Sequence, residues 1–266
     1  MAVQERIRKV EAIVISHSDY GEADRILNLF TREMGKARAL AKGARKEHSR
    51  KAGHIEPFTC TTLMLAKGTS FWIVSQAETV DAFPSIREDL TKTAQAAYVV
   101  ELLERFTSEG EIQPPLYRLV KETLGRIAFQ TDAFQTLRYF ETRFLEMVGY
   151  RPELFHCVQC RAEIQAEDQF FSILQGGVMC PKCGNIADTT RPVSMLVLKY
   201  LRHFQRSDFK DIQQLDVPPF IRQEMEKLMQ SYLTYLAERK LNTPAFLRAI
   251  HPPTDLQNIP DDKIIK

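Results

Sequence analysis

Four of the five cysteines in this 266-residue chain form two closely spaced pairs, and this array constrains the fold more than any other feature of the sequence. Cys157 and Cys160 make the first pair and Cys180 and Cys183 the second, which gives the spacing C-x₂-C-x₁₉-C-x₂-C. Each two-residue gap allows a tight turn with both sulfurs facing one ion, as in a closed tetrahedral Zn²⁺ site. The sequence therefore predicts one structural Zn²⁺ ion per chain, held by these four cysteines.

The glycines beside the second pair agree with this prediction. Gly176 and Gly177 precede the pair and Gly184 follows it, and glycine allows positive φ angles and close backbone approach. Disulfide bonds are the alternative. Five cysteines are few for a chain of this length, and no signal peptide precedes them, so the sequence gives little support to an oxidising compartment.

Length and composition suggest an ordinary globular protein with two domains. The chain is 44% hydrophobic and 26% charged, and no apolar run is long enough to cross a bilayer. We therefore expect a soluble, cytoplasmic protein. The net charge is only +2, but residues 32–51 contain eight Lys or Arg against two Glu. This segment has a marked local excess of positive charge.

The sequence predicts an α+β fold. Short β-type runs separated by glycines predict five strands, at Ile7–Ser16, Ile26–Thr31, Lys36–Lys42, Pro57–Ala66 and Phe71–Val80. Five strands of this size are typical of an OB-fold barrel, which we assign to residues 1–82. From Pro84 onward apolar residues recur at helical spacing, so we assign a helical domain to residues 83–250, with the cysteine module inserted at about residues 153–190. Residues 251–266 are predicted to be a flexible tail.

The basic segment is the candidate nucleic-acid surface. Alternating residues of a strand share one face, so the basic residues of the third strand and the loop after it would form a positive surface on the barrel. Its members are Lys36, Arg38, Lys42, Arg45, Lys46, Arg50 and Lys51. A solvated charged face without a ligand is the alternative. Nearby aromatic residues could stack on bases, although barrel core is the more common role: Phe30, Phe58, Phe71 and Trp72.

The order of short segments along the chain resembles the bacterial RecO family of recombination mediators. The resemblance covers roughly residues 6–205 and rests on Tyr20–Ile26, Leu29–Thr31, Gly35, Ala41–Arg45, Ile55–Phe58, Ala77–Glu78, Phe140–Glu141, Gly149–Pro152, Cys157–Cys160 and Gly176–Gly177 before the second cysteine pair. It implies an OB-fold, a helical domain and a zinc motif. It also implies that the protein binds single- and double-stranded DNA, anneals complementary strands and acts together with RecR. It further implies that the protein helps RecA to displace single-stranded-DNA-binding protein from coated strands.

From this resemblance we expect a non-enzymatic protein of the bacterial cytoplasm that is nucleoid-associated when it acts. A groove with basic edges in the helical domain would hold the acidic, apolar-ended tail of the single-stranded-DNA-binding protein. Arg126, Arg138 and Arg143 interrupt apolar helix patterns and are candidates for that edge, although ordinary solvent-facing arginines are the commoner case.

Two other functions stay open. An RNA-binding factor could also combine an OB-fold with a zinc ribbon, and it would recognise ribose through its 2′-OH groups. A zinc hydrolase or deaminase is less favoured, because four cysteines leave no open position for water. The only deaminase-like motif is His54-Ile55-Glu56, and it lacks the proline that should precede the second cysteine pair. The sequence contains no phosphate-binding glycine motif.

Overall fold

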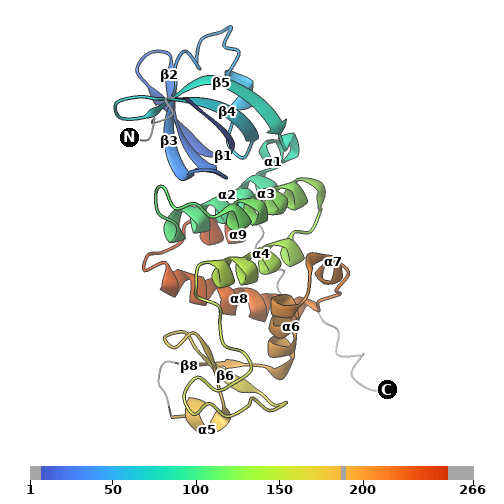
Figure 1. The fold of residues 1–266 in the computed structure, drawn as a ribbon. Helices are drawn as coiled ribbons and strands as arrows, with labels where there is room; N and C mark the ends of the chain where they lie inside the picture. Colours follow the sequence, from blue (N-terminus) through green and yellow to red (C-terminus); the bar gives the residue numbers. More distant parts are fainter. Residues whose placement is uncertain (1–6, 187–189, 251–266) are drawn as a thin grey trace.

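The computed structural model describes residues 7–186 and 190–250. A β-barrel lies at one end, helices form the middle, and the cysteine module lies at the other end (Figure 1). The tail predicted at residues 251–266 lies outside the described residues. The division of the chain at residues 82 and 83 stays a prediction.

Five strands close into the barrel: β1 (Ile7–Tyr20), β2 (Asp24–Thr31), β3 (Gly35–Ala41), β4 (Cys60–Lys67) and β5 (Trp72–Asp81). Their order is β1-β2-β3-β5-β4, and all neighbours are antiparallel except β3 and β5. Alternating side chains such as Leu27, Leu29, Leu63 and Leu65 fill the interior. The predicted OB-like barrel is confirmed.

Two strand boundaries differ from the prediction by three residues or more. β1 continues four residues beyond Ser16, because a bulge after Val14 is followed by further pairing with β2. The residues from His17 to Tyr20 are mostly polar, so they lack the alternating apolar pattern that predicts a strand packed on a core. β4 begins at Cys60, not at Pro57. Phe58 has a φ of 66°, outside the range of extended strands, so the regular strand starts after it.

Helices follow the barrel in two groups, one before and one after the cysteine module. The first contains α1 (Pro84–Glu88), α2 (Leu90–Phe106), α3 (Pro114–Phe129) and α4 (Phe134–Met147). The last, after the cysteine module, contains α6 (Met195–Arg206), α7 (Phe209–Ile212), α8 (Pro219–Leu236) and α9 (Thr243–Ile250). The apolar stripes predicted from the sequence are the buried faces of α2, α3, α4, α6 and α8. None of the helices in the described ranges is long and apolar enough to span a membrane.

The barrel packs directly on the helices. Ile13, Phe30 and Cys60 belong to the same buried cluster as residues of α2, α3 and α4. Lys121 of α3 also pairs with Glu11 of β1 at 2.9 Å and with Asp81 of β5 at 3.1 Å. The barrel and the helices therefore share a core and hold each other in one orientation.

The cysteine module lies between α4 and α6 and contains β6 (Gln169–Ser172), β7 (Gly177–Met179), α5 (Pro181–Gly184) and β8 (Thr190–Val193). Its strands form a small antiparallel sheet of order β7-β6-β8. Phe171 and Val178 of this sheet belong to the helical core, and Gly176 lies against Tyr232 of α8. The module is an insertion that packs on the helical core.

Candidate metal centre and nucleic-acid surface

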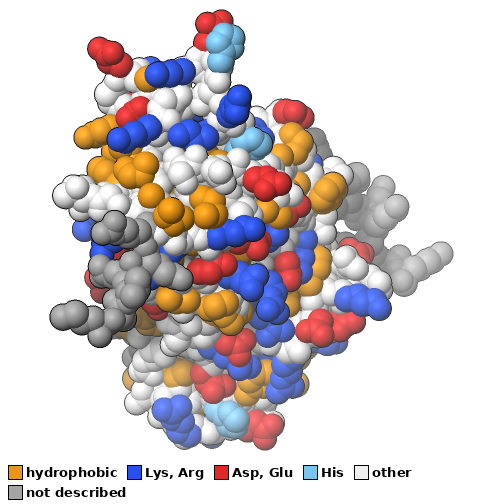
Figure 2. Space-filling view, turned by 45° about the horizontal axis from the view of Figure 1, so that its top comes forward, with side chains coloured by type: hydrophobic (Ala, Val, Ile, Leu, Met, Phe, Trp, Pro, Cys, Tyr) orange, Lys and Arg blue, Asp and Glu red, His pale blue; other side chains and the backbone are white. Residues whose placement is uncertain are grey.

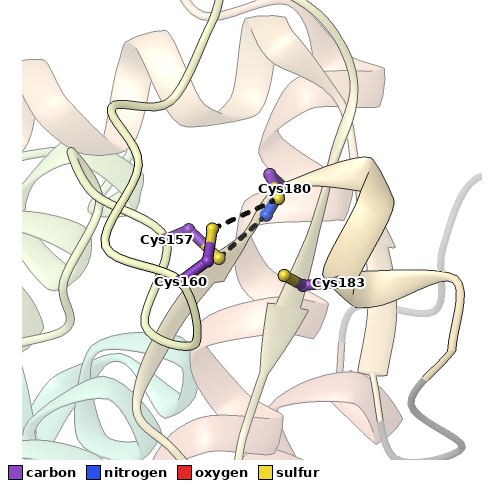
Figure 3. Close-up of side chains that lie close together, drawn as sticks. All are labelled: Cys157, Cys160, Cys180 and Cys183. Atoms are coloured by element: carbon purple, nitrogen blue, oxygen red, sulfur yellow. Dashed lines mark hydrogen bonds between the residues drawn. The ribbon is translucent and has the colours of Figure 1, made fainter.

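The structure brings the sulfurs of Cys157, Cys160, Cys180 and Cys183 together (Figure 3). All four lie within 4.8 Å of one another, and the sulfurs of Cys160 and Cys180 are 3.8 Å apart. Around an ion with Zn–S bonds of about 2.3 Å, the edge of a sulfur tetrahedron is about 3.8 Å. The four cysteines are free thiols, so the disulfide alternative is not what the structure shows.

Local backbone geometry positions each pair. The chain turns sharply after Cys157, whose N–H donates to Ala162 O at 2.8 Å, and Arg161 has a φ of 65°. Cys180 precedes the one-turn helix α5, and Cys183 N donates to Cys180 O at 3.0 Å. A side chain at Gly184 would collide with the ring of Phe170. The glycine predicted to allow close approach is therefore required there.

The thiols also show why this cluster favours a cation. Burial would raise the pKa of Cys157, but backbone N–H groups of Cys160, Cys180 and Gln159 outweigh it and lower that pKa to about 6. At Cys183 the effect is opposite: hydrogen bonding with the side chain of Cys180, with a smaller contribution from burial, raises the pKa to about 12. A bound cation would stabilise the thiolate form of all four cysteines, so the four residues could hold a metal ion.

Three of the seven predicted DNA-binding residues have partners within the protein. Lys36 donates from Nζ to the carbonyl oxygen of Glu104 in α2 at 3.0 Å. Arg45 pairs with Asp19 at 3.3 Å. Lys51 donates to the carbonyl oxygen of Val74 at 3.3 Å. These contacts fix parts of the barrel, so the three residues are less available to a ligand.

The other four are Arg38, Lys42, Lys46 and Arg50. They are exposed, and within the described residues their side chains have no hydrogen bond or ion pair. Figure 2 shows Lys and Arg side chains over the barrel, with apolar side chains between them and some acidic groups at the edge. The alternation predicted for β3 is present, since Ala37 and Ala39 face inward while Arg38 faces outward.

The three arginines predicted for the helical domain are not solvent-facing. Arg126 stacks on Phe209 with its guanidinium carbon 3.8 Å from the ring centre. Arg143 donates to the carbonyl oxygens of Gln205 and Ser207 at 3.1 and 2.7 Å. Arg138 is 5% exposed and pairs with Glu141 at 2.6 Å. Arg126 and Arg143 contact later helical segments and Arg138 pairs within α4, which corrects the expectation of ordinary surface arginines.

Comparison with known families accounts for both parts of the chain. The family model described as "Recombination protein O N terminal" matches residues 5–83 and therefore covers the barrel. The model described as "Recombination protein O C terminal" matches residues 87–245, including the cysteine cluster. This chain belongs to the RecO family. The resemblance found in the sequence is thereby confirmed.

Curated RecO-family relatives match most of the chain. "DNA repair protein RecO" from Roseiflexus sp. (strain RS-1) is 37% identical over 245 residues, which are 92% of this chain and 86% of the relative. The protein of the same name from Desulforamulus reducens is 35% identical, over 92% of this chain and 96% of the relative. A third, from Bacillus pumilus, is 35% identical over 90% and 93%.

The deaminase-like motif of this RecO-family chain is remote from the metal centre. His54 and Glu56 belong to the barrel, at the opposite end of the molecule from the cysteines (Figure 1). His54 Nδ1 lies 2.7 Å from the hydroxyl of Thr79, and Glu56 accepts from Arg25 at 3.0 Å. Both side chains stabilise the barrel locally, so the structure does not assemble a deaminase site from them.

One groove that the sequence did not predict runs along α6. Met195 and Leu196 are exposed there, and the groove has a volume of about 630 Å³. Basic residues line its rim: Lys199, Arg202, His203 and Arg206. The helical spacing of these cations beside two apolar residues was the available signal. The apolar pattern of α6 does not by itself distinguish the exposed Met195 and Leu196 from the buried Val197 and Leu198.

Proposed function

We propose that this protein is a non-enzymatic mediator of DNA repair and homologous recombination in the bacterial cytoplasm. It would bind single- and double-stranded DNA, anneal complementary strands and, with RecR, help RecA onto strands coated by single-stranded-DNA-binding protein. It would be nucleoid-associated while it acts. The observation that carries this proposal is the exposed, unpaired cations of an OB-like barrel in a chain whose relatives are named DNA repair proteins.

In this proposal the metal ion is Zn²⁺ and is structural. Four thiolates complete a tetrahedral shell, so no position is left for water or substrate. The ion would link the loop that holds Cys157 and Cys160 to the segment that holds Cys180 and Cys183. DNA would instead contact the barrel, where cations reduce the repulsion between two phosphate backbones. Charge neutralisation is a sufficient physical cause for faster pairing of complementary strands.

A strand-annealing assay tests this proposal. Two complementary DNA oligonucleotides, one labelled, should pair faster with the protein than without it, and the acceleration should decrease steeply as salt rises. It should persist when ATP and Mg²⁺ are omitted. Strict dependence on ATP, or a cleaved or deaminated product, would contradict the non-enzymatic assignment. Faster pairing of RNA than of DNA strands would instead favour the RNA-binding alternative.

The same assay on coated strands tests the partner. The groove along α6 combines apolar and basic residues, which suits an acidic peptide with an apolar end better than Arg126, Arg138 and Arg143 do, because contacts within the protein hold those three. We therefore place the tail of the single-stranded-DNA-binding protein there. Deleting that tail should slow annealing on coated strands and leave annealing on naked strands unchanged. A protein that binds only through nonspecific charge would treat both coating proteins alike.

The unpaired cations should set the salt dependence of DNA binding. For single strands the slope of log affinity against log salt is about 0.7 per neutralised phosphate. Replacing Lys42, Lys46 and Arg50 with alanine should therefore reduce this slope by about 2 and weaken all sequences alike. The matched control replaces Arg118, Lys210 and Lys227, which are equally charged and exposed on the helices. Equal slopes in both triple variants would show that DNA binds elsewhere.

A further inference from the structure

Aromatic side chains gather on the outside of the barrel, beside the unpaired cations. Phe71 and Trp72 are only partly buried, whereas Phe30 and Phe58 are 1% and 8% exposed. Tyr20 is 49% exposed and contacts Phe71 edge-to-face, with ring centres 6.4 Å apart. Core packing explains Phe30 and Phe58, but it leaves ring surface of the other three open to solvent. Phe30 and Phe58 thus have the core role that is more common, whereas Phe71 and Trp72 are only partly buried.

Arg38 of β3 lies against Phe71 of this group. Its guanidinium carbon is 5.1 Å from the ring centre of Phe71, within the range of a cation–π contact. Among the described residues, no carboxylate or carbonyl group pairs with this guanidinium and no second ring covers it. The Arg38 guanidinium is therefore held beside Phe71 and is available to a second planar group.

These residues line a groove of about 530 Å³ between β3, the β4–β5 loop and the turn after α2. Three cations line it, namely Lys36, Arg38 and Lys67, and Glu109 is the acidic residue among its lining. The groove is thus positively charged and also carries aromatic surface. In OB-folds, the loops after β1 and β4 together with the adjoining strands form the oligonucleotide-binding face, and these residues come from that region.

From this geometry we infer that the groove is a base-stacking subsite for single-stranded DNA. One unpaired base would stack on the Arg38 guanidinium, backed by Phe71, and a neighbouring base would contact Trp72. Bases have planar faces that suit both aromatic rings and arginine planes. In a duplex these faces are already stacked, so the subsite would favour single strands over duplexes. The inference rests on the proposal that the barrel binds DNA, and it adds recognition of bases to recognition of phosphates.

The chain contains a single tryptophan, which gives this subsite its own optical signal. A stacked base quenches indole emission, whereas a phosphate contact leaves it nearly unchanged. The probes are an oligothymidylate of about 16 nucleotides, within the range for OB-folds, and an abasic oligonucleotide of equal length and charge. We expect the oligothymidylate to quench Trp72 and to bind at least about fivefold more tightly than the abasic strand at the same salt.

Two variants separate stacking from charge. Phe71→Leu keeps apolar bulk but removes the ring, and Arg38→Lys keeps the charge but removes the plane. Each should lower the preference for the base-containing strand by about fivefold or more while leaving the salt slope unchanged. The control is Phe129→Leu, because Phe129 is 88% exposed on the helices and should not affect binding. Arg38→Lys changes only an exposed side chain, so it remains informative if Phe71→Leu disturbs the fold.

The outcomes distinguish this inference from the proposed function. Equal affinity for the base-containing and abasic strands, with no quenching of Trp72, would overturn the stacking subsite and leave phosphate binding intact. Failure of both strands to bind would overturn the proposed function itself, and the subsite with it. If the oligothymidylate quenches Trp72 in the original protein but not in Arg38→Lys, the result would support both the stacking subsite and the proposed function.

Discussion

Replacing Cys160 with serine should release the metal ion and unfold the cysteine module. Binding of structural Zn²⁺ contributes about 10–16 kcal/mol in zinc-finger peptides at pH 7, more than the whole stability of most domains. Serine keeps the size of cysteine but is a poor ligand, so the remaining three sulfurs would hold the ion weakly. Elemental analysis of purified protein should find about one zinc per chain in the original protein and little in the variant.

The effect should be confined to the neighbourhood of the module. Residues around 150–190 should lose protection in hydrogen exchange, while the barrel keeps the emission spectrum of Trp72. Cys60→Ala is the matched control, since Cys60 is buried in the barrel, where burial raises its pKa to about 12. That variant should retain its zinc. Protein purified without chelator that contains no metal would contradict the assignment of these cysteines.

The convergence of the four cysteines could be predicted because its signal is local. Two pairs with two-residue gaps, followed by glycine, are sufficient to imply turns that converge on one ion, whatever the rest of the chain does. The five strands of the barrel were also recognisable, since each carries its own apolar pattern. The end of β1 was not, because the residues from His17 to Tyr20 form a strand only through pairing with β2.

The surroundings of single charged residues could not be predicted from local sequence. Lys36 and Arg38 were correctly predicted to lie on the same face of β3. However, no residue near Lys36 in the sequence indicates that its Nζ reaches the carbonyl oxygen of Glu104 in α2. Arg126 interrupts an apolar stripe in a way that fits either a surface or a buried position. Its contact with Phe209 depends on α7, which follows more than eighty residues later. Such contacts depend on packing between elements.

Replacing Glu141 with glutamine should destabilise the helical domain by about 3–5 kcal/mol. Glu141 is fully buried and accepts hydrogen bonds at 2.6 Å from both Tyr98 and Arg138. Glutamine can still accept from Tyr98, but it leaves the Arg138 guanidinium buried without a counter-charge. The cost therefore comes mainly from the uncompensated cation. Urea unfolding followed by far-UV circular dichroism measures it.

The double variant Arg138→Met/Glu141→Gln provides the decisive control. Removing both charges avoids an unpaired buried ion, so the double variant should be considerably more stable than Glu141→Gln alone. The Nε and Nη1 atoms of Arg138 and the Oε2 atom of Glu141 have no partner among the described residues, which makes this pair costly to keep. If the double variant lost as much unfolding free energy as Arg138→Met and Glu141→Gln lose together, the ion pair itself would contribute little.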